Sequence, residues 1–243
     1  MATFCFENPS LYEANLGAPY PSGEGRGLQN LYPVVRIHSA SPMSFGHMRE
    51  ENILRGLIVP GLNGSGPAHW QTLWEHQYKF ERVEQLDWGN PDAVIWTESL
   101  DAVIREHPHK VVIVAHSLGC WTVIHWAALH ADSKDRVLSA LLVAPPDIAS
   151  APELPTSTIN FTNHKKKKLP FPSILVGSEN DPYMTPNKAQ ALARSTGSSF
   201  INAGFVGHIN INSGHGPWPQ GEALLQRLMS SLDCCSLASQ EAI

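Results

Sequence analysis

A serine flanked by small residues stands between a β-branched run and an apolar helical pattern. Residues 115–119 read AHSLG and follow the run KVVIVA. A sharp turn between a strand and a helix holds a serine hydroxyl clear of the sheet, as in the motif G-x-S-x-G. Ala115 replaces the first glycine of that motif with the smallest residue that carries a Cβ. Ser117 is therefore a candidate nucleophile. The alternative is a helix N-cap, although no Glu or Gln stands at position 120 to complete a capping box.

A serine nucleophile needs a base, and the base needs an acid that orients it. When the chain order is serine, acid and histidine, the acid follows a late strand. The apolar run 172–177 is followed by Asp181, and Pro182 restricts the Asp181 backbone to extended conformations. Asp181 is the predicted acid. Glu179 is the alternative, but it lies closer to the strand and is less suited to reach over the sheet.

The predicted base follows the next short run of the chain. Residues 199–202 lead into a glycine-containing loop that carries His208. A glycine-containing loop gives a general base the mobility it needs, so His208 is the predicted base. His215, seven residues later, remains the alternative, and either histidine could instead be a surface residue.

Acyl transfer also needs hydrogen-bond donors for the developing oxyanion. One predicted donor is the backbone N–H of Leu118, directly after the nucleophile. The second is expected from the loop PGLNGSG at residues 60–66, where three glycines let the backbone turn and present N–H groups. Leu62 and Asn63 are both candidates. The loop lacks the G-K-[ST] ending of a phosphate-binding loop.

Neither a metal nor a cofactor is predicted. His116, His125 and His130 have no accompanying carboxylate or H-E-x-x-H spacing, so we expect structural roles for them. Four cysteines stand at positions that suit neither a disulfide framework nor a zinc site, namely Cys5, Cys120, Cys234 and Cys235. A reducing cytoplasm is the expected location.

Short apolar runs alternate with longer helical patterns beyond residue 52, which predicts a mostly parallel sheet with helices on both faces, an α/β fold. Strands are expected at residues 53–60, 80–86, 110–115, 137–144, 172–177 and 199–202. Helices are expected at 67–78, 91–106, 118–130, 186–195 and 222–232. Each chemical motif follows the carboxyl end of a strand, where α/β proteins usually place their sites.

Composition limits the class of protein. The chain has 243 residues, which allows one ordinary domain with a tail, and its net charge is −5. No surplus of basic residues exists to neutralise a nucleic acid, and no apolar run is long enough to cross a bilayer.

Residues 1–51 are rich in Gly and Pro, and we expect a flexible extension there without a signal or transit peptide. The catalytic domain is predicted over 52–233, followed by a tail at 234–243.

These motifs together resemble the small serine hydrolases related to retinoblastoma-binding protein 9, within the α/β-hydrolase superfamily. The matching segments occur in one order over nearly the whole domain: VPGLNGSGPAHWQTLWE (59–75), VVIVAHSLGCWTVIHWA (111–127), ALLVAPPD (140–147), LPFPSILVGSENDPY (169–183), GHINI (207–211) and SGHGPWPQG (213–221). The resemblance implies an α/β-hydrolase without a large lid. It also implies Ser117, Asp181 and His208 as the catalytic triad.

Two departures from that family limit what the resemblance implies. The first fifty residues have no counterpart in the minimal fold. The L-x-C-x-E sequence linked to retinoblastoma-protein binding is absent, because Cys5 is preceded by Thr3 and Phe4 without the leucine. The protein partner is therefore unknown.

The leading hypothesis is a metal-independent serine hydrolase that cleaves a small ester or amide through an acyl-enzyme. The alternative is a catalytically silent binding module that keeps the fold. The aromatic residues near the motif loops suggest an aromatic or apolar pocket, but each could instead belong to the core: Trp70, Trp74, Trp121, Tyr183 and Trp218.

Overall fold

The computed structural model describes residues 55–151, 154–162 and 168–238. The extension predicted for residues 1–51 and the chain beyond residue 238 lie outside these ranges, as does Cys5. In the part of the chain that is described, no helix is both long and apolar enough to cross a membrane.

Six parallel strands form one sheet in the order β2-β1-β3-β4-β5-β6. The strands are β1 (Arg55–Val59), β2 (Glu81–Arg82), β3 (Val111–His116), β4 (Val137–Val143), β5 (Ser173–Gly177) and β6 (Ser199–Asn202). The central strands β3 and β4 are buried almost throughout, as strands covered on both faces must be. The predicted α/β architecture is confirmed.

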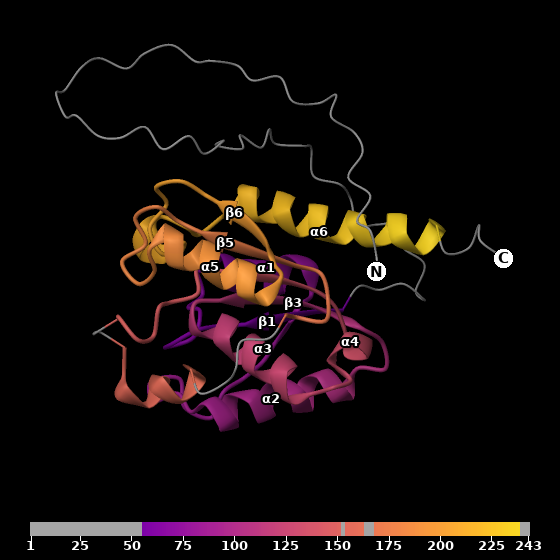
Figure 1. The fold of residues 1–243 in the computed structure, drawn as a ribbon, viewed down its shortest axis with the longest axis horizontal. Coiled ribbons are helices and arrows are strands. Elements are labelled where there is room, and N and C mark those ends of the chain that lie inside the picture. Colours follow the sequence, from indigo (N-terminus) through magenta and orange to yellow (C-terminus); the bar gives the residue numbers. More distant parts are fainter. Residues whose placement is uncertain (1–54, 152–153, 163–167, 239–243) are drawn as a thin grey trace, which may run out of the picture. The chain divides into compact units, whose positions relative to one another are not determined.

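Helices cover both faces of the sheet (Figure 1). On one face, α2 (Ala93–Glu106), α3 (Leu118–Leu129) and α5 (Pro186–Thr196) pack on the alternate strand residues represented by Ile113 and Leu142. On the other face, α1 (Trp70–Tyr78) and α6 (Pro219–Ala238) contribute residues to a second core with Val112, Val114 and Leu141. The two-residue period of each strand thus divides its side chains between two cores.

Local signals explain where several helices begin and end. The Asp92 carboxylate accepts hydrogen bonds from the N–H groups of Val94 and Ile95, which caps α2. Pro186 occupies the first turn of α5, where its missing N–H costs nothing, and Gly197 ends that helix with a φ of 74°. These signals are readable in the sequence.

Some elements differ from the sequence-based expectation. The strand expected over 80–86 is reduced to the two residues of β2, while Phe80 and Val83 on either side are buried in the core. A short helix α4 (Ser133–Arg136) and the 3₁₀ helices η3 (Thr156–Thr162) and η4 (Ile211–Ser213) were not predicted. Helix α6 is longer than the expected 222–232 and runs past residue 233.

Two glycines allow a close approach between β1, its following loop and the turn after β3. A Cβ on Gly119 would lie 2.2 Å from the carbonyl oxygen of Val59. A Cβ on Gly61 would lie 2.7 Å from the Cβ of Ser117 and 2.9 Å from the backbone nitrogen of Leu118. All three distances are too short for a real Cβ atom, so this junction requires glycine at both positions.

We expect Gly119→Ala to destabilise the protein by about 1–3 kcal/mol, because the added methyl group collides with backbone atoms that cannot rotate away. The matched control is Gly66→Ala, where an added Cβ meets no heavy atom within 4 Å. Urea unfolding followed by circular dichroism measures both. Equal stability of the two variants would contradict the close packing described for α3 and β1.

Candidate active site

Ser117 occupies the sharp turn between β3 and α3. Its backbone has a φ of 52° and a ψ of −124°, a conformation that non-glycine residues rarely adopt. The Ser117 N–H donates to the carbonyl of Val143 at 2.9 Å, which ties the turn to the neighbouring strand. Although Ser117 stands at the N-cap position of α3, its side chain makes no capping hydrogen bond. The hydroxyl is instead free to face the loop that carries His208.

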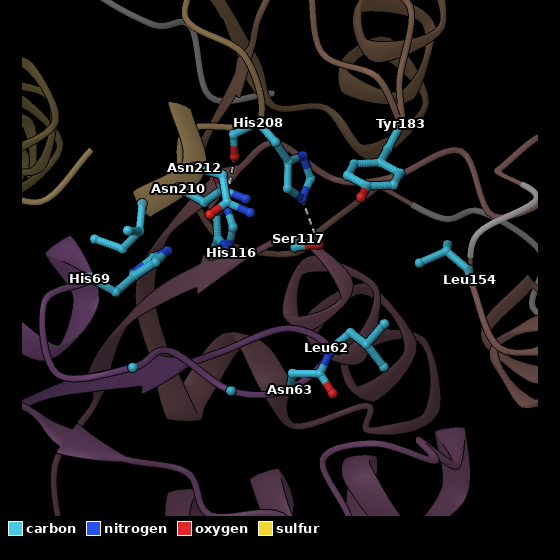
Figure 2. Close-up of a pocket in the computed structure, with 13 residues that line it drawn as sticks. Leu62, Asn63, His69, His116, Ser117, Leu154, Tyr183, His208, Asn210 and Asn212 are labelled. Atoms are coloured by element: carbon cyan, nitrogen blue, oxygen red, sulfur yellow. Dashed lines mark hydrogen bonds between the residues drawn. The ribbon is translucent and has the colours of Figure 1, made fainter. Parts of the chain in front are cut away.

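A chain of hydrogen bonds joins Ser117, His208 and Asp181. The Nε2 atom of His208 lies 2.9 Å from the Oγ of Ser117 (Figure 2). The Nδ1 atom lies 3.0 Å from both carboxylate oxygens of Asp181. A carboxylate only accepts hydrogen bonds, so Nδ1 carries the hydrogen and Nε2 is left as the acceptor for the serine hydroxyl. This is the tautomer that can take a proton from a serine.

Burial and local hydrogen bonding hold Asp181 in place. Its side chain is only 1% exposed, and one of its oxygens accepts the N–H of Tyr183 at 2.9 Å. Pro182 stands inside this short turn. The ring of Tyr183 in turn meets the His208 ring edge-on, with centroids 4.6 Å apart. The acid and the imidazole are therefore both held against rotation.

The alternative acid and base make other contacts. The Oε1 of Glu179 accepts a hydrogen bond from the Nδ2 of Asn202 at 3.0 Å. The Nδ1 of His215 lies 3.2 Å from the Oγ of Ser213, and its ring packs near Trp218. Within the described residues, neither side chain hydrogen bonds to Ser117 or to His208.

The loop between β1 and α1 brings backbone N–H groups towards the serine. The Asn63 N–H donates to the carbonyl of Trp88 at 2.9 Å, and the Gly64 N–H donates to the carbonyl of Gly61 at 3.0 Å. Within the described ranges, the Leu62 N–H has no such acceptor. Leu62 and Asn63 both line the pocket, but only the Leu62 N–H is uncommitted.

A buried glutamine supports this loop. Gln71, which is 0% exposed, accepts a hydrogen bond from the Ser65 hydroxyl at 2.6 Å. Its amide nitrogen donates to the carbonyl of Val114 at 3.0 Å. The loop after β1 is therefore fixed to the end of β3, the strand that leads into Ser117.

Two histidines that sequence reasoning had not placed in the site lie beside His208. His116 Nε2 lies 2.9 Å from the His208 carbonyl oxygen, so Nε2 must be the donor. The ring centroids of His69 and His116 are 5.0 Å apart, as are those of His116 and His208. The position of His116 directly before the serine was a usable signal, whereas nothing in the sequence pairs His69 with this loop.

Burial keeps these neighbouring histidines uncharged. Burial and the nearby Arg82 cation lower the pKa of His69 to about 4. Burial lowers the pKa of His116 well below its ordinary value. Burial also lowers the pKa of His215. At neutral pH the three neighbouring histidines of His208, namely His69, His116 and His215, are therefore uncharged imidazoles.

Cys120 lies one turn of α3 beyond the serine and is buried and free. Its thiol donates weakly to the carbonyl of Val143, and burial raises the pKa of the thiol. A thiol held in its protonated form is unreactive. Cys120 is thus a packing residue.

A pocket of about 530 Å³ opens above Ser117. Its polar lining includes Asn63, Asn210 and Asn212, and no Asp, Glu, Lys or Arg is among the described residues that line it. Figure 2 shows His69 and His116 on one side of Ser117, with Tyr183 and Leu154 on the other.

The expectation of an aromatic pocket holds only for Tyr183. The four tryptophans named as candidates are core residues with at most 6% exposure, namely Trp70, Trp74, Trp121 and Trp218. Trp70, Trp74 and Trp218 pack on one another beneath the site, and none of the four lines the pocket.

Across residues 55–151, 154–162 and 168–238, no three or more His, Cys, Asp or Glu side chains are grouped to hold a metal ion. The reactive groups that the site itself presents are a hydrogen-bonded serine, histidine and carboxylate.

Known structures share this fold. A YdeN-like hydrolase from Pectobacterium atrosepticum is 27% identical with a TM-score of 0.64, matching 74% of this chain and 91% of that chain. The ydeN gene product of B. subtilis is 18% identical with a TM-score of 0.60, matching 73% and 99%. A monoacylglycerol lipase from Paleococcus ferrophilus is 14% identical with a TM-score of 0.56, matching 72% and 94%. The last two likenesses concern the fold alone.

The fold is that of the α/β-hydrolases. The chain belongs to the serine hydrolase family, whose sequence model matches residues 56–227. Among curated proteins, none has a significantly similar sequence.

The lowered histidine pKa values predict a loss of stability in acid. A histidine ionises near pH 6.5 in the unfolded chain, whereas His69 resists protonation until about pH 4 in the fold. The contribution of neutral His69 to the free energy of unfolding is therefore complete above pH 6.5. It is lost as the pH falls towards 4. By linkage, His69 alone should reduce the free energy of unfolding by about 2 kcal/mol between pH 7.5 and pH 5.

Urea unfolding at these two pH values tests the expectation. His69→Asn should show a smaller acid loss than the unsubstituted protein, since asparagine does not titrate. His109→Asn is the matched control, because His109 is exposed at the opposite end of β3. An unchanged acid loss in His69→Asn would contradict the role assigned to burial.

Proposed function

We propose that this protein is a metal-independent serine hydrolase that cleaves a small ester or amide through an acyl-enzyme on Ser117. The observation that carries the proposal is the continuous hydrogen bonding from Ser117 Oγ through His208 to Asp181, at 2.9 and 3.0 Å. Both groups beyond the serine are nearly buried, with side chains 8% and 1% exposed. A buried, oriented base of this kind is what raises the reactivity of a serine hydroxyl.

In the proposed mechanism, His208 Nε2 takes the proton of Ser117 Oγ while that oxygen attacks the substrate carbonyl. The tetrahedral intermediate then collapses, and His208 returns the proton to the leaving alcohol or amine. Water, deprotonated by the same imidazole, then attacks the acyl carbon. The bond to Ser117 Oγ breaks, Oγ recovers the proton from His208, and the carboxylic acid leaves. The Asp181 carboxylate stabilises the imidazolium at both stages.

The proposed oxyanion donors are the N–H groups of Leu118 and Leu62. Leu118 begins α3, where the first N–H groups lack helical acceptors. The free Leu62 N–H and the bond of Asn63 to Trp88 favour Leu62 over Asn63 as the second donor. A Cβ on Gly61 would collide with the Leu118 nitrogen, and this close approach of the loop to the start of α3 supports the proposal that both donors serve one oxygen.

Three finer assignments are also part of the proposal. The ordered sequence segments support a place near the hydrolases related to retinoblastoma-binding protein 9. The absence of a disulfide pattern among the four cysteines supports a reducing compartment such as the cytoplasm. The pocket volume of about 530 Å³ fits a small-molecule substrate.

We expect Ser117→Ala and His208→Ala each to lower kcat by roughly 10⁴ to 10⁶ on p-nitrophenyl acetate, because each removes a member of the triad. Neither variant should react with a fluorophosphonate probe at the rate of the unsubstituted protein. Circular dichroism checks that both variants fold. A catalytically silent binding module would remain unlabelled even before substitution, and full activity of Ser117→Ala would exclude this mechanism.

The acid is tested by a matched pair of amide substitutions. Asp181→Asn should lower kcat by at least about 10², because the amide cannot stabilise the imidazolium and can favour the wrong tautomer. Glu179→Gln should cost less than about tenfold, since the glutamine oxygen can still accept the Asn202 hydrogen bond. Steady-state kinetics on the same ester compares them. A larger loss of kcat in Glu179→Gln than in Asp181→Asn would transfer the acid role to Glu179.

A further inference from the structure

His69 is a buried donor on the wall of the active-site pocket. It follows the loop after β1 and stands at the N-cap of α1, and it is only 5% exposed. Its ring contacts those of Trp70 and His116, at centroid distances of 5.3 and 5.0 Å. It lines the same pocket as Ser117 and His208 (Figure 2).

The hydrogen bond at one ring nitrogen fixes the tautomer of His69. The backbone N–H of Gln71 donates to Nδ1 at 3.2 Å, so this nitrogen carries no hydrogen. The neutral ring must then carry its hydrogen on Nε2. Within the described chain, no side chain or backbone group accepts from Nε2. Nε2 is not one of the fully buried polar atoms left without a partner, so this donor is open to the pocket that His69 lines and is available to an oxygen of the substrate.

The charge of the pocket limits what that partner can be. With its pKa lowered to about 4, His69 is uncharged near neutral pH and offers a neutral N–H. The described lining holds no acidic or basic side chain other than histidine. A carboxylate or phosphate would therefore lose its hydration without gaining an ion pair. An ether, hydroxyl or carbonyl oxygen is better matched to a single neutral donor.

We infer that His69 is a specificity-determining residue that donates its Nε2–H to a second, uncharged oxygen of the substrate. This inference rests on the proposed hydrolase function. The substrate class is a short neutral ester with an ether, hydroxyl or carbonyl oxygen a few bonds from the scissile carbonyl. This spacing is argued from the shared neighbour of the two histidines: His69 and His208 each contact the His116 ring at a centroid distance of 5.0 Å, so one small substrate can reach both.

Pairs of substrates that differ only by an oxygen in place of a methylene test the inference. Three acyl pairs are offered as p-nitrophenyl esters: methoxyacetyl with butanoyl, 3-methoxypropanoyl with pentanoyl, and 4-methoxybutanoyl with hexanoyl. A fourth pair, 2-methoxyethyl acetate and butyl acetate, places the oxygen in the alcohol. For each pair, kcat/KM is measured with the unsubstituted protein, His69→Asn and His69→Phe.

His69→Asn removes the donor from the pocket while asparagine remains a favourable N-cap for α1. His69→Phe keeps a ring of similar size and serves if the first variant folds poorly. His109→Asn is the control for the substitution itself, at an exposed position. For each pair, the kcat/KM of the oxygen-containing ester is divided by that of the methylene ester. The intrinsic reactivity of each ester cancels when this ratio is compared between proteins.

For at least one pair, we expect both His69 variants to lower this ratio at least about fivefold, the effect of one uncharged hydrogen bond. All ratios of the control His109→Asn should change little. Unchanged ratios in both His69 variants would overturn the inference and leave the proposed hydrolase intact. The same holds if a fluorophosphonate labels Ser117 but no oxygenated ester is turned over. Absence of both labelling and turnover would instead overturn the proposed function itself.

Discussion

The strained backbone at Ser117 is the constraint on which the rest of the site depends. A non-glycine residue with a φ of 52° and a ψ of −124° costs on the order of 1–3 kcal/mol, so its surroundings must hold it there. The bond from the Ser117 N–H to Val143 does so from one side. The contact of Gly119 with the Val59 carbonyl does so from the other. The turn is therefore held between strands β4 and β1.

Parallel pairing converts this local constraint into a site. Val59, Ala115 and Leu142 are register partners near the carboxyl ends of β1, β3 and β4, so the loops that follow begin at one edge of the sheet. The His116 side chain then donates to the carbonyl of His208, which is 92 positions away in sequence. The turn that carries the serine is in this way bonded to the loop that carries the histidine.

The sequence was sufficient to find groups whose position follows from strand order. Ser117, Asp181 and His208 each stand in the loop or turn that follows a predicted strand, and the structure brings these three together. It was insufficient where a contact depends on loop paths. The choice between Leu62 and Asn63 turns on a bond to the Trp88 carbonyl, which no spacing rule links to that loop. The short β2 was overestimated because burial of its flanks imitates a strand.

The uncharged state of the neighbouring imidazoles matters for the proposed chemistry. Attack by Ser117 leaves an imidazolium on His208, and a second positive charge 5.0 Å away would repel it. Burial prevents this by disfavouring protonation of His116 and His69. The same burial allows both rings to act as neutral donors: His116 donates to the His208 carbonyl, and His69 is left with a donor that faces the pocket. Of these three histidines only His208 is paired to a carboxylate, and in the proposed mechanism it is the one that carries the proton between the serine and the leaving group.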